Sequence, residues 1–196
     1  MASSSYALIL FSLLIFSFSA LKVSLSLYYQ TLCFGCSQFI VLELPKIFKN
    51  GFIDIVDLNL VPYGNANILK NGTIICQHGP DECFFNTVEA CAINVMSVCD
   101  QCHLELLYAY LTVALNPPHE YVPWVTVNEV PIRMDIENFM KYICKAYKGT
   151  STPKACKELP KGVIPAEPTP NLKVCRVNDT SRMTKPRPRG ITGWKF

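Results

Sequence analysis

The sequence predicts an α/β fold with a central mixed sheet flanked by helices, and three observations support that class. Residues 22–29 alternate apolar and polar side chains, as a partly buried strand does. Cys33 and Cys36 follow at once and open a segment of helical period. Residues 53–61 then form a second strand-like segment, so the chain begins β-α-β, with a parallel pair and a right-handed crossover expected.

The individual helices and strands are assigned from the period of the hydrophobic residues and from the residues that end such elements. Residues 37–50 carry apolar side chains near a 3.6-residue period, and Pro45 should kink this helix. Residues 82–97 form the next predicted helix, with Phe84 and Val88 on its apolar stripe. The remaining predicted elements are a helix over 104–115, strands over 121–128 and 130–133, and a last helix that Asp135 caps and that runs to about Tyr147.

Residues 65–102 are predicted to be a shortened, disulfide-rich helical insertion. Without them the order is β-α-β-α-β-β-α, the order of a thioredoxin-like fold, which carries a redox pair directly after its first strand. A cysteine at a helix N-terminus is favoured as a thiolate, and a second cysteine one turn along can release a bound substrate. We therefore predict that Cys33 attacks and Cys36 resolves. The spacing alone would also fit a structural disulfide or half of a zinc site.

Pro123 supplies the second part of the predicted site. A proline that opens the third strand of this fold commonly follows a cis peptide bond, which is rare elsewhere. Facing the cysteine pair, it would leave the backbone of Val122 free to pair with an extended substrate chain. Val122 and Pro123 are therefore the predicted substrate-binding residues. The alternative is an ordinary trans proline at the start of a strand.

Composition indicates an exported protein. The chain has 196 residues, of which 50% are hydrophobic, a size that fits one domain with extensions. Residues 1–19 hold an uncharged apolar run followed by small residues, as in a cleaved secretory signal, and residues 20–150 form the expected domain. No later segment is long enough to span a membrane. Ten cysteines and the sequons at Asn71 and Asn178 agree with a disulfide-permitting, glycosylating compartment.

Residues 151–196 form a basic, proline-rich C-terminal segment. From Lys157 onward it carries nine basic and three acidic residues, whereas the whole chain has a net charge of +3. Such a composition buries little apolar surface, so the segment is predicted to be a solvated tail without regular structure. It lacks the interleaved aromatic residues of a nucleic-acid site, and no nucleic-acid partner is expected.

One segment carries a long motif. Its eight defining positions are Cys76, Gln77, His78, Gly79, Glu82, Cys83, Asn86 and Cys91. The motif resembles the signature of the gamma-interferon-inducible lysosomal thiol reductase family. Residues 61–66, 71–73 and 117–125 resemble that family too, so the resemblance extends over roughly residues 22–149.

The resemblance implies a soluble glycoprotein that reduces disulfides of protein substrates in a lysosomal or vacuolar compartment. It implies Cys33 as nucleophile, Cys36 as resolving thiol, a small thiol as electron donor and no further cofactor. The signature cysteines would be scaffold disulfides, with His78 and Gly79 shaping the turn before the helix. Family members carry a further cysteine-containing helical stretch that is shortened here. That difference motivates an alternative: a non-catalytic, disulfide-stapled binding module descended from a reductase.

Two smaller alternatives stay open at the level of sequence. Cys99 and Cys102 could complete a zinc site with Cys76 and His78, although an oxidising route favours disulfides and no metal is expected. His119 follows two prolines and is predicted to order a turn near the third strand, with proton transfer beside the cysteine pair as the other option. Spacing cannot decide the disulfide connectivity.

Overall fold

A computed structural model describes residues 22–49, 51–94, 101–150, 152–158 and 173–179, with the backbone alone for residues 101–106. The predicted signal and Cys99 lie outside these residues. Within the described part of the chain, no helix is both long and apolar enough to cross a bilayer.

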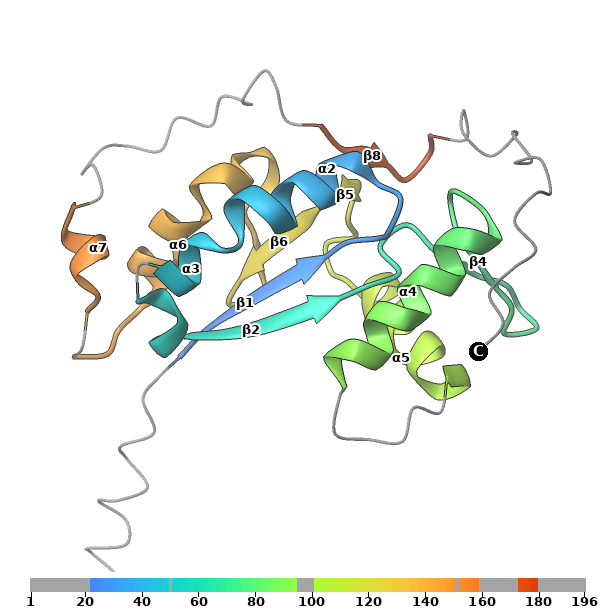
Figure 1. The fold of residues 1–196 in the computed structure, drawn as a ribbon, viewed down its shortest axis with the longest axis horizontal. Coiled ribbons are helices and arrows are strands. Elements are labelled where there is room, and N and C mark those ends of the chain that lie inside the picture. Colours follow the sequence, from blue (N-terminus) through green and yellow to red (C-terminus); the bar gives the residue numbers. More distant parts are fainter. Residues whose placement is uncertain (1–21, 50, 95–100, 151, 159–172, 180–196) are drawn as a thin grey trace, which may run out of the picture.

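The centre of the fold is a four-stranded mixed sheet in the order β2-β1-β6-β7. Strand β1 (Val23–Tyr28) pairs in parallel with β2 (Val56–Val61) and antiparallel with β6 (Trp124–Val127), which also pairs with β7 (Val130–Pro131). The parallel β1–β2 pair confirms the predicted β-α-β opening (Figure 1). The predicted α/β class with a mixed sheet is confirmed.

One face of the sheet holds the main hydrophobic core. Val23, Leu25 and Leu27 alternate along β1 and point into it. The covering helices are α2 (Phe34–Gln38), a π-helical turn (Phe39–Glu43), α3 (Lys46–Lys49) and α6 (Phe139–Ala146), with a 3-10 turn at Phe52–Asp54 (Figure 1). The rings of Phe39 and Phe139 meet edge to face, with centroids 5.6 Å apart.

The predicted kink at Pro45 is present. Proline has no N–H to donate, so the regular helical ladder ends before it. The amide of Leu44 reaches back to the carbonyl of Phe39 at 2.9 Å, and helix α3 starts again at Lys46. The predicted single helix over 37–50 is therefore three short helical segments.

The other face is covered by α4 (Pro80–Ile93) and α5 (Gln101–Val113), beside a small hairpin of β3 (Asn67–Ile68) and β4 (Ile74–Ile75). A second apolar cluster there includes Tyr63, Ala90 and Ala109. The predicted apolar stripe of α4 is wrong, because Phe84 and Val88 are 62% and 50% exposed. The helix instead buries Glu82, Asn86, Thr87 and Ala90.

The last predicted helix begins later than expected. A 3-10 segment, Arg133–Asn138, precedes α6, and Asp135 within it has non-helical backbone angles. Its carboxylate accepts hydrogen bonds from Asn138 Nδ2 at 2.6 Å and from Tyr142 Oη at 2.8 Å. Asp135 therefore bridges to the first turns of α6 instead of capping a helix that starts beside it.

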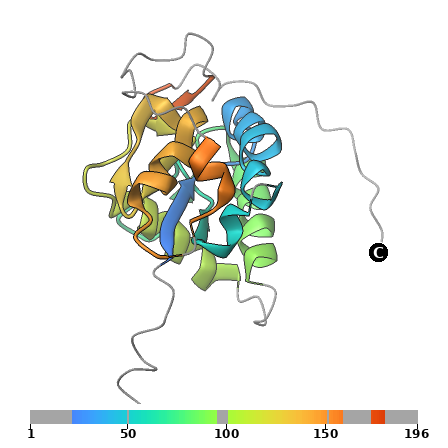
Figure 2. The same cartoon turned by 90° about the vertical axis from the view of Figure 1, so that its left-hand side faces the viewer.

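Two stretches of the predicted tail have regular structure. Helix α7 (Lys154–Glu158) lies beside α6, and the Cys144–Cys156 disulfide joins the two (Figures 1 and 2). Strand β8 (Cys175–Arg176) pairs antiparallel with β5 (Tyr121–Val122). For these residues the prediction of an unstructured segment is wrong. Disulfides and edge-strand pairing hold them to the domain, and neither can be read from composition.

Candidate active site

Cys33 sits at the junction that the sequence predicts, between β1 and α2. It is the N-cap residue of α2, with extended backbone angles (φ −92°, ψ 115°), and Leu32 before it has a φ of +60°. Cys36 follows in the first turn of the helix. Both cysteine side chains are 1% exposed.

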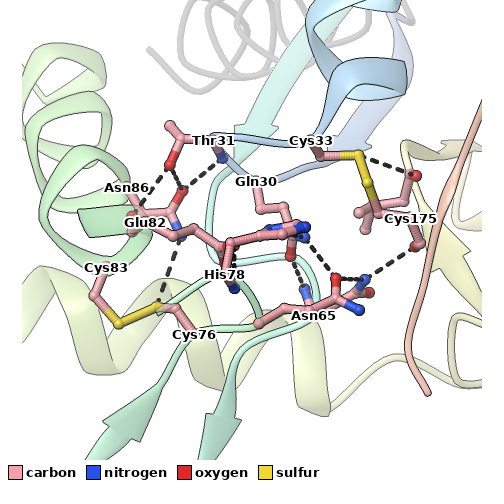
Figure 3. A network of polar contacts seen from close by, with 12 residues as sticks. Gln30, Thr31, Cys33, Asn65, Cys76, His78, Glu82, Cys83, Asn86 and Cys175 are labelled. Atoms are coloured by element: carbon pink, nitrogen blue, oxygen red, sulfur yellow. Dashed lines mark hydrogen bonds and ion pairs between the residues drawn. A yellow bond between two sulfur atoms is a disulfide. The ribbon is translucent and has the colours of Figure 1, made fainter. Parts of the chain in front are cut away.

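The two cysteines are not bonded to each other in this structure. Cys33 forms a disulfide with Cys175 of strand β8, across 142 residues of sequence and with Cα atoms 6.1 Å apart (Figure 3). Cys36 is a free thiol, and among the cysteines whose side chains the structure describes it alone is not in a disulfide. Burial raises the pKa of the Cys36 thiol to about 12, so the sulfur is held in its protonated form.

Strand β5 lies directly against this disulfide. Val122 pairs with Cys175, and the Val122 carbonyl oxygen is 3.8 Å from Cys33 Sγ. The Val122–Pro123 peptide bond is cis, as the sequence predicts. The backbone of Val122 does pair with an extended segment beside Cys33, and in this structure that segment is the chain's own.

Three side-chain amides, those of Gln30, Asn65 and Gln77, form a hydrogen-bonded group beside the disulfide. Gln77 Oε1 accepts hydrogen bonds from Gln30 Nε2 at 2.8 Å and Asn65 Nδ2 at 2.7 Å. Its Nε2 then donates to the carbonyl oxygens of Arg176 at 2.6 Å and Asp179 at 3.0 Å. Asn65 Nδ2 also donates to the carbonyl oxygen of Cys175 at 2.9 Å (Figure 3). Sequence reasoning singled out Gln77 only as a motif position and missed both Gln30 and Asn65.

Asn86 of the signature connects α4 to the loop before Cys33. Its Oδ1 accepts the backbone N–H of Thr31 at 2.8 Å and lies 3.0 Å from the Thr31 hydroxyl (Figure 3). Asn86 is fully buried. The contact holds the residue two places before Cys33 to a helix on the other side of the sheet.

Glu82 and His78 close the turn that opens α4. The buried carboxylate of Glu82 accepts the His78 backbone N–H at 2.9 Å and also contacts His78 Nδ1. Burial raises the pKa of Glu82, because the charged carboxylate is removed from water. Gly79 is the N-cap residue of α4 and has a φ of +91°, a conformation that suits glycine.

All three signature cysteines are in disulfides. Cys76 is bonded to Cys83, and Cys91 is disulfide-bonded too. The zinc alternative is wrong for Cys76, because its sulfur is already in a covalent bond. Across the described ranges, no group of three or more His, Cys, Asp or Glu side chains is placed to hold a metal ion.

His119 forms a hydrogen bond with the side chain of Asn65. Its Nε2 lies 3.2 Å from Asn65 Oδ1, and burial lowers the pKa of the imidazole. Because both Asn65 Nδ2 hydrogens have carbonyl partners, Oδ1 acts as the acceptor and His119 as the donor. The predicted glycosylation residues Asn71 and Asn178 are both exposed.

Comparison with known proteins identifies the family. The sequence model of the gamma interferon inducible lysosomal thiol reductase family matches residues 24–112. A gamma-interferon-responsive lysosomal thiol protein of Arabidopsis thaliana is 38% identical over 69% of this chain and 76% of its own length. The gamma-interferon-inducible lysosomal thiol reductase of Mus musculus is 34% identical over 70% and 73%. The corresponding protein of Carassius auratus is 32% identical over 71% and 74%.

The matched family region contains the β1–α2 junction, the signature motif and Asn65, whereas Val122, His119 and Cys175 of the site lie outside it. The chain therefore belongs to the gamma-interferon-inducible lysosomal thiol reductase family, a family of oxidoreductases.

Proposed function

We propose that the protein reduces disulfides of protein substrates by thiol–disulfide exchange in an acidic lysosomal or vacuolar compartment reached through the secretory route. The names of its relatives, which are lysosomal thiol proteins and thiol reductases, support the reaction class and the compartment. The observation that carries the proposal is the free thiol of Cys36 in the first turn of the helix that Cys33 caps, with Cys33 already in a disulfide to an extended strand.

The proposed reaction has two exchange steps. Cys33, as a thiolate, attacks one sulfur of a substrate disulfide and forms a mixed disulfide, while the other substrate sulfur leaves and takes up a proton. Cys36 then loses its proton and attacks Cys33 Sγ. The second substrate thiol leaves, and a Cys33–Cys36 disulfide forms. Two electrons have passed to the substrate, and two molecules of a small thiol restore the enzyme as they become one disulfide.

The protonation state of Cys36 shapes the second step. Because burial raises its pKa to about 12, the resolving sulfur is a thiol at acidic and neutral pH. Its proton must leave as the sulfur attacks. Cys33 is the attacking sulfur in the proposal because it lies at the start of α2, where N–H groups without helical partners favour a thiolate.

Cysteine variants test these roles. We expect Cys33→Ser to abolish reduction of a protein disulfide in the presence of a small thiol, because the attacking sulfur is gone. Cys36→Ser should instead accumulate a mixed disulfide between Cys33 and the substrate, detectable by mass spectrometry under non-reducing conditions. Full activity in Cys33→Ser would reject the assignment.

A second candidate function is a non-catalytic, disulfide-stapled binding module, and the observation that favours it is the Cys33–Cys175 bond. The two functions differ in the reactivity of Cys33. In a Cys175→Ala variant, the alkylation rate of Cys33 by iodoacetamide is measured against pH. A midpoint well below about 8.5, the ordinary thiol pKa, supports the enzyme, and a midpoint at or above it supports the module.

A further inference from the structure

The segment 173–179 lies in the candidate active site as a bound peptide would. We propose that it is an internal pseudo-substrate, and that Asn65 and Gln77, with the edge of β5, form the subsite for the main chain of an extended, cysteine-containing polypeptide. This inference rests on the proposed function, because it takes Cys33 as the attacking sulfur.

The hydrogen bonds that Asn65, Gln77 and strand β5 make to the segment all involve its main chain, whereas the Cys175 sulfur and the Lys173 ammonium, 4.4 Å from the Phe34 ring centroid, make side-chain contacts. Strand β8 pairs with β5, and the Val177 N–H donates to the Glu120 carbonyl at 3.2 Å. Asn65 and Gln77 donate to carbonyl oxygens of the bonded cysteine, the next residue and the residue four places on. Main-chain carbonyls are common to all polypeptides. The hydrogen-bonding part of the subsite therefore fits any extended chain with a disulfide-bonded cysteine, and a cation two places before that cysteine can also lie over the Phe34 ring.

The amide donors are oriented by contacts that do not involve the segment. Gln77 is 3% exposed, and its Oε1 is held by bonds from Gln30 and Asn65, so its Nε2 must point toward the segment. His119 fixes the Asn65 amide in the same way. A buried amide donor without a partner is unfavourable. The site is thus built to receive carbonyl oxygens along an extended chain.

The start of α2 leaves space for a backbone beside Cys33. A Cβ atom added to Gly35 would lie 1.8 Å from the carbonyl oxygen of Lys173, so only glycine permits this approach. A pocket of about 510 Å³ remains beside the disulfide, lined by Phe34, His78 and Lys173 among others. Substrates bulkier than this segment could place side chains there.

Occupation by the segment closes the site until a thiol exchange opens it. Cys36 can lose its proton and attack Cys33 Sγ, which breaks the Cys33–Cys175 bond. The Cys175 sulfur takes up a proton and a Cys33–Cys36 disulfide forms, so nothing is oxidised or reduced overall. A small thiol then reduces that disulfide, and the site is ready for an external substrate.

The test compares two substrates in the full chain carrying Cys175→Ala, which cannot form the internal bond. One substrate is the peptide of residues 173–179, Lys-Val-Cys-Arg-Val-Asn-Asp, as a mixed disulfide with a small thiol. The other is cystamine, a disulfide without peptide bonds. We expect Gln77→Glu, which keeps the acceptor but loses the donor, to raise the KM for the peptide roughly tenfold. The kcat for the peptide should change less than its KM, and the rate with cystamine should fall by a smaller factor than kcat/KM for the peptide.

Two further measurements guard against a folding defect in Gln77→Glu. Asn65→Asp should also raise the KM for the peptide, whereas Asn59→Asp, on the exposed side of β2, should not. A peptide methylated on the Val177 amide nitrogen cannot donate to Glu120, so its KM should rise several-fold with the subsite intact.

The outcomes separate the inference from the proposed function. If the Cys175→Ala protein reduces neither substrate, the proposed function fails. If it reduces both but the peptide KM is the same in all variants and for the methylated peptide, the subsite is refuted and the reductase stands. Equal loss with both substrates in Gln77→Glu would make Gln77 structural and overturn its part of the subsite.

Discussion

Cys36 is almost completely shielded from the solvent. Its side chain is 1% exposed, and burial raises its pKa from 9.0 to about 12. Because the pKa of this thiol is higher in the folded protein than in the unfolded chain, the protonated thiol favours the folded state. Its contribution to the free energy of unfolding is complete below about pH 9. That contribution declines as the pH rises from 9 through 12, because the unfolded chain ionises first.

The same burial predicts low reactivity of Cys36 toward added reagents. At pH 8 only about one Cys36 side chain in ten thousand is a thiolate when the pKa is near 12. We expect native, non-reduced protein to leave Cys36 unmodified by iodoacetamide at pH 8, whereas the same protein in guanidinium chloride is alkylated there. Peptide mass spectrometry measures both. Fast native alkylation of Cys36 would contradict the buried placement.

The partner of Cys33 shows the limit of sequence at the residue scale. The position of Cys33 after a strand and before a helix is predictable, because hydrophobic period and turn residues are local signals. Its bond to Cys175 is not, since 142 residues separate the two and ten cysteines allow many pairings. The predicted roles of Cys33 and Cys36 stay predictions until the variants are measured.

Among the elements, α4 departs most from what its apolar pattern indicates. A helix normally buries its apolar stripe, yet here Phe84 is exposed and the buried side carries Glu82 and Asn86. The reason is that the signature side chains bond to the loop before Cys33 and to the turn at His78. For this helix, the hydrogen bonds that its polar side chains make at the site decide which side is buried, and the apolar pattern does not.

The buried polar side and exposed apolar side of α4 predict effects of different size from two substitutions. Asn86→Leu, which makes the buried side of the helix more apolar, should lower the free energy of unfolding by about 1–3 kcal/mol, because the partly buried Thr31 N–H loses its acceptor on the fully buried Asn86 side chain. Phe84→Ser should change it by less than about 0.5 kcal/mol, because Phe84 is 62% exposed. Urea unfolding followed by circular dichroism measures both. The reverse order would refute the assignment of the buried face.

At the scale of the whole molecule, disulfides and one strand pairing hold the C-terminal segments onto the domain. Cys144–Cys156 holds α7 to α6, and Cys33–Cys175 holds β8 to β5. Composition predicted a solvated tail for this region because proline and charge dominate it. The tethered stretches are ordered because covalent bonds and main-chain pairing supply what apolar burial does not.

The Cys144–Cys156 bond should therefore stabilise the whole domain. It closes a loop of 12 residues, so replacing both cysteines by alanine should lower the free energy of unfolding by about 2–3 kcal/mol. Lys154→Ala on the same helix is the control. Its ion pair with Glu158 is largely exposed, and the change should be within about 0.5 kcal/mol. Equal denaturation midpoints for the double variant and the parent would show that α7 contributes nothing.

The sequence by itself determined the α/β class, the parallel β-α-β opening and the kink at Pro45, and it favoured the cis bond before Pro123 that the structure shows. These features depend on the local hydrophobic period, on the residues that form turns and on the order of helices and strands along the chain. Only the tertiary structure decided what surrounds Cys33. Gln30, Asn65 and Gln77 come from three separate segments and bond to one another, and Asn65 donates to the Cys175 carbonyl across 110 residues of sequence. No local pattern encodes such contacts, because chain folding alone brings these amides and carbonyls within hydrogen-bonding distance.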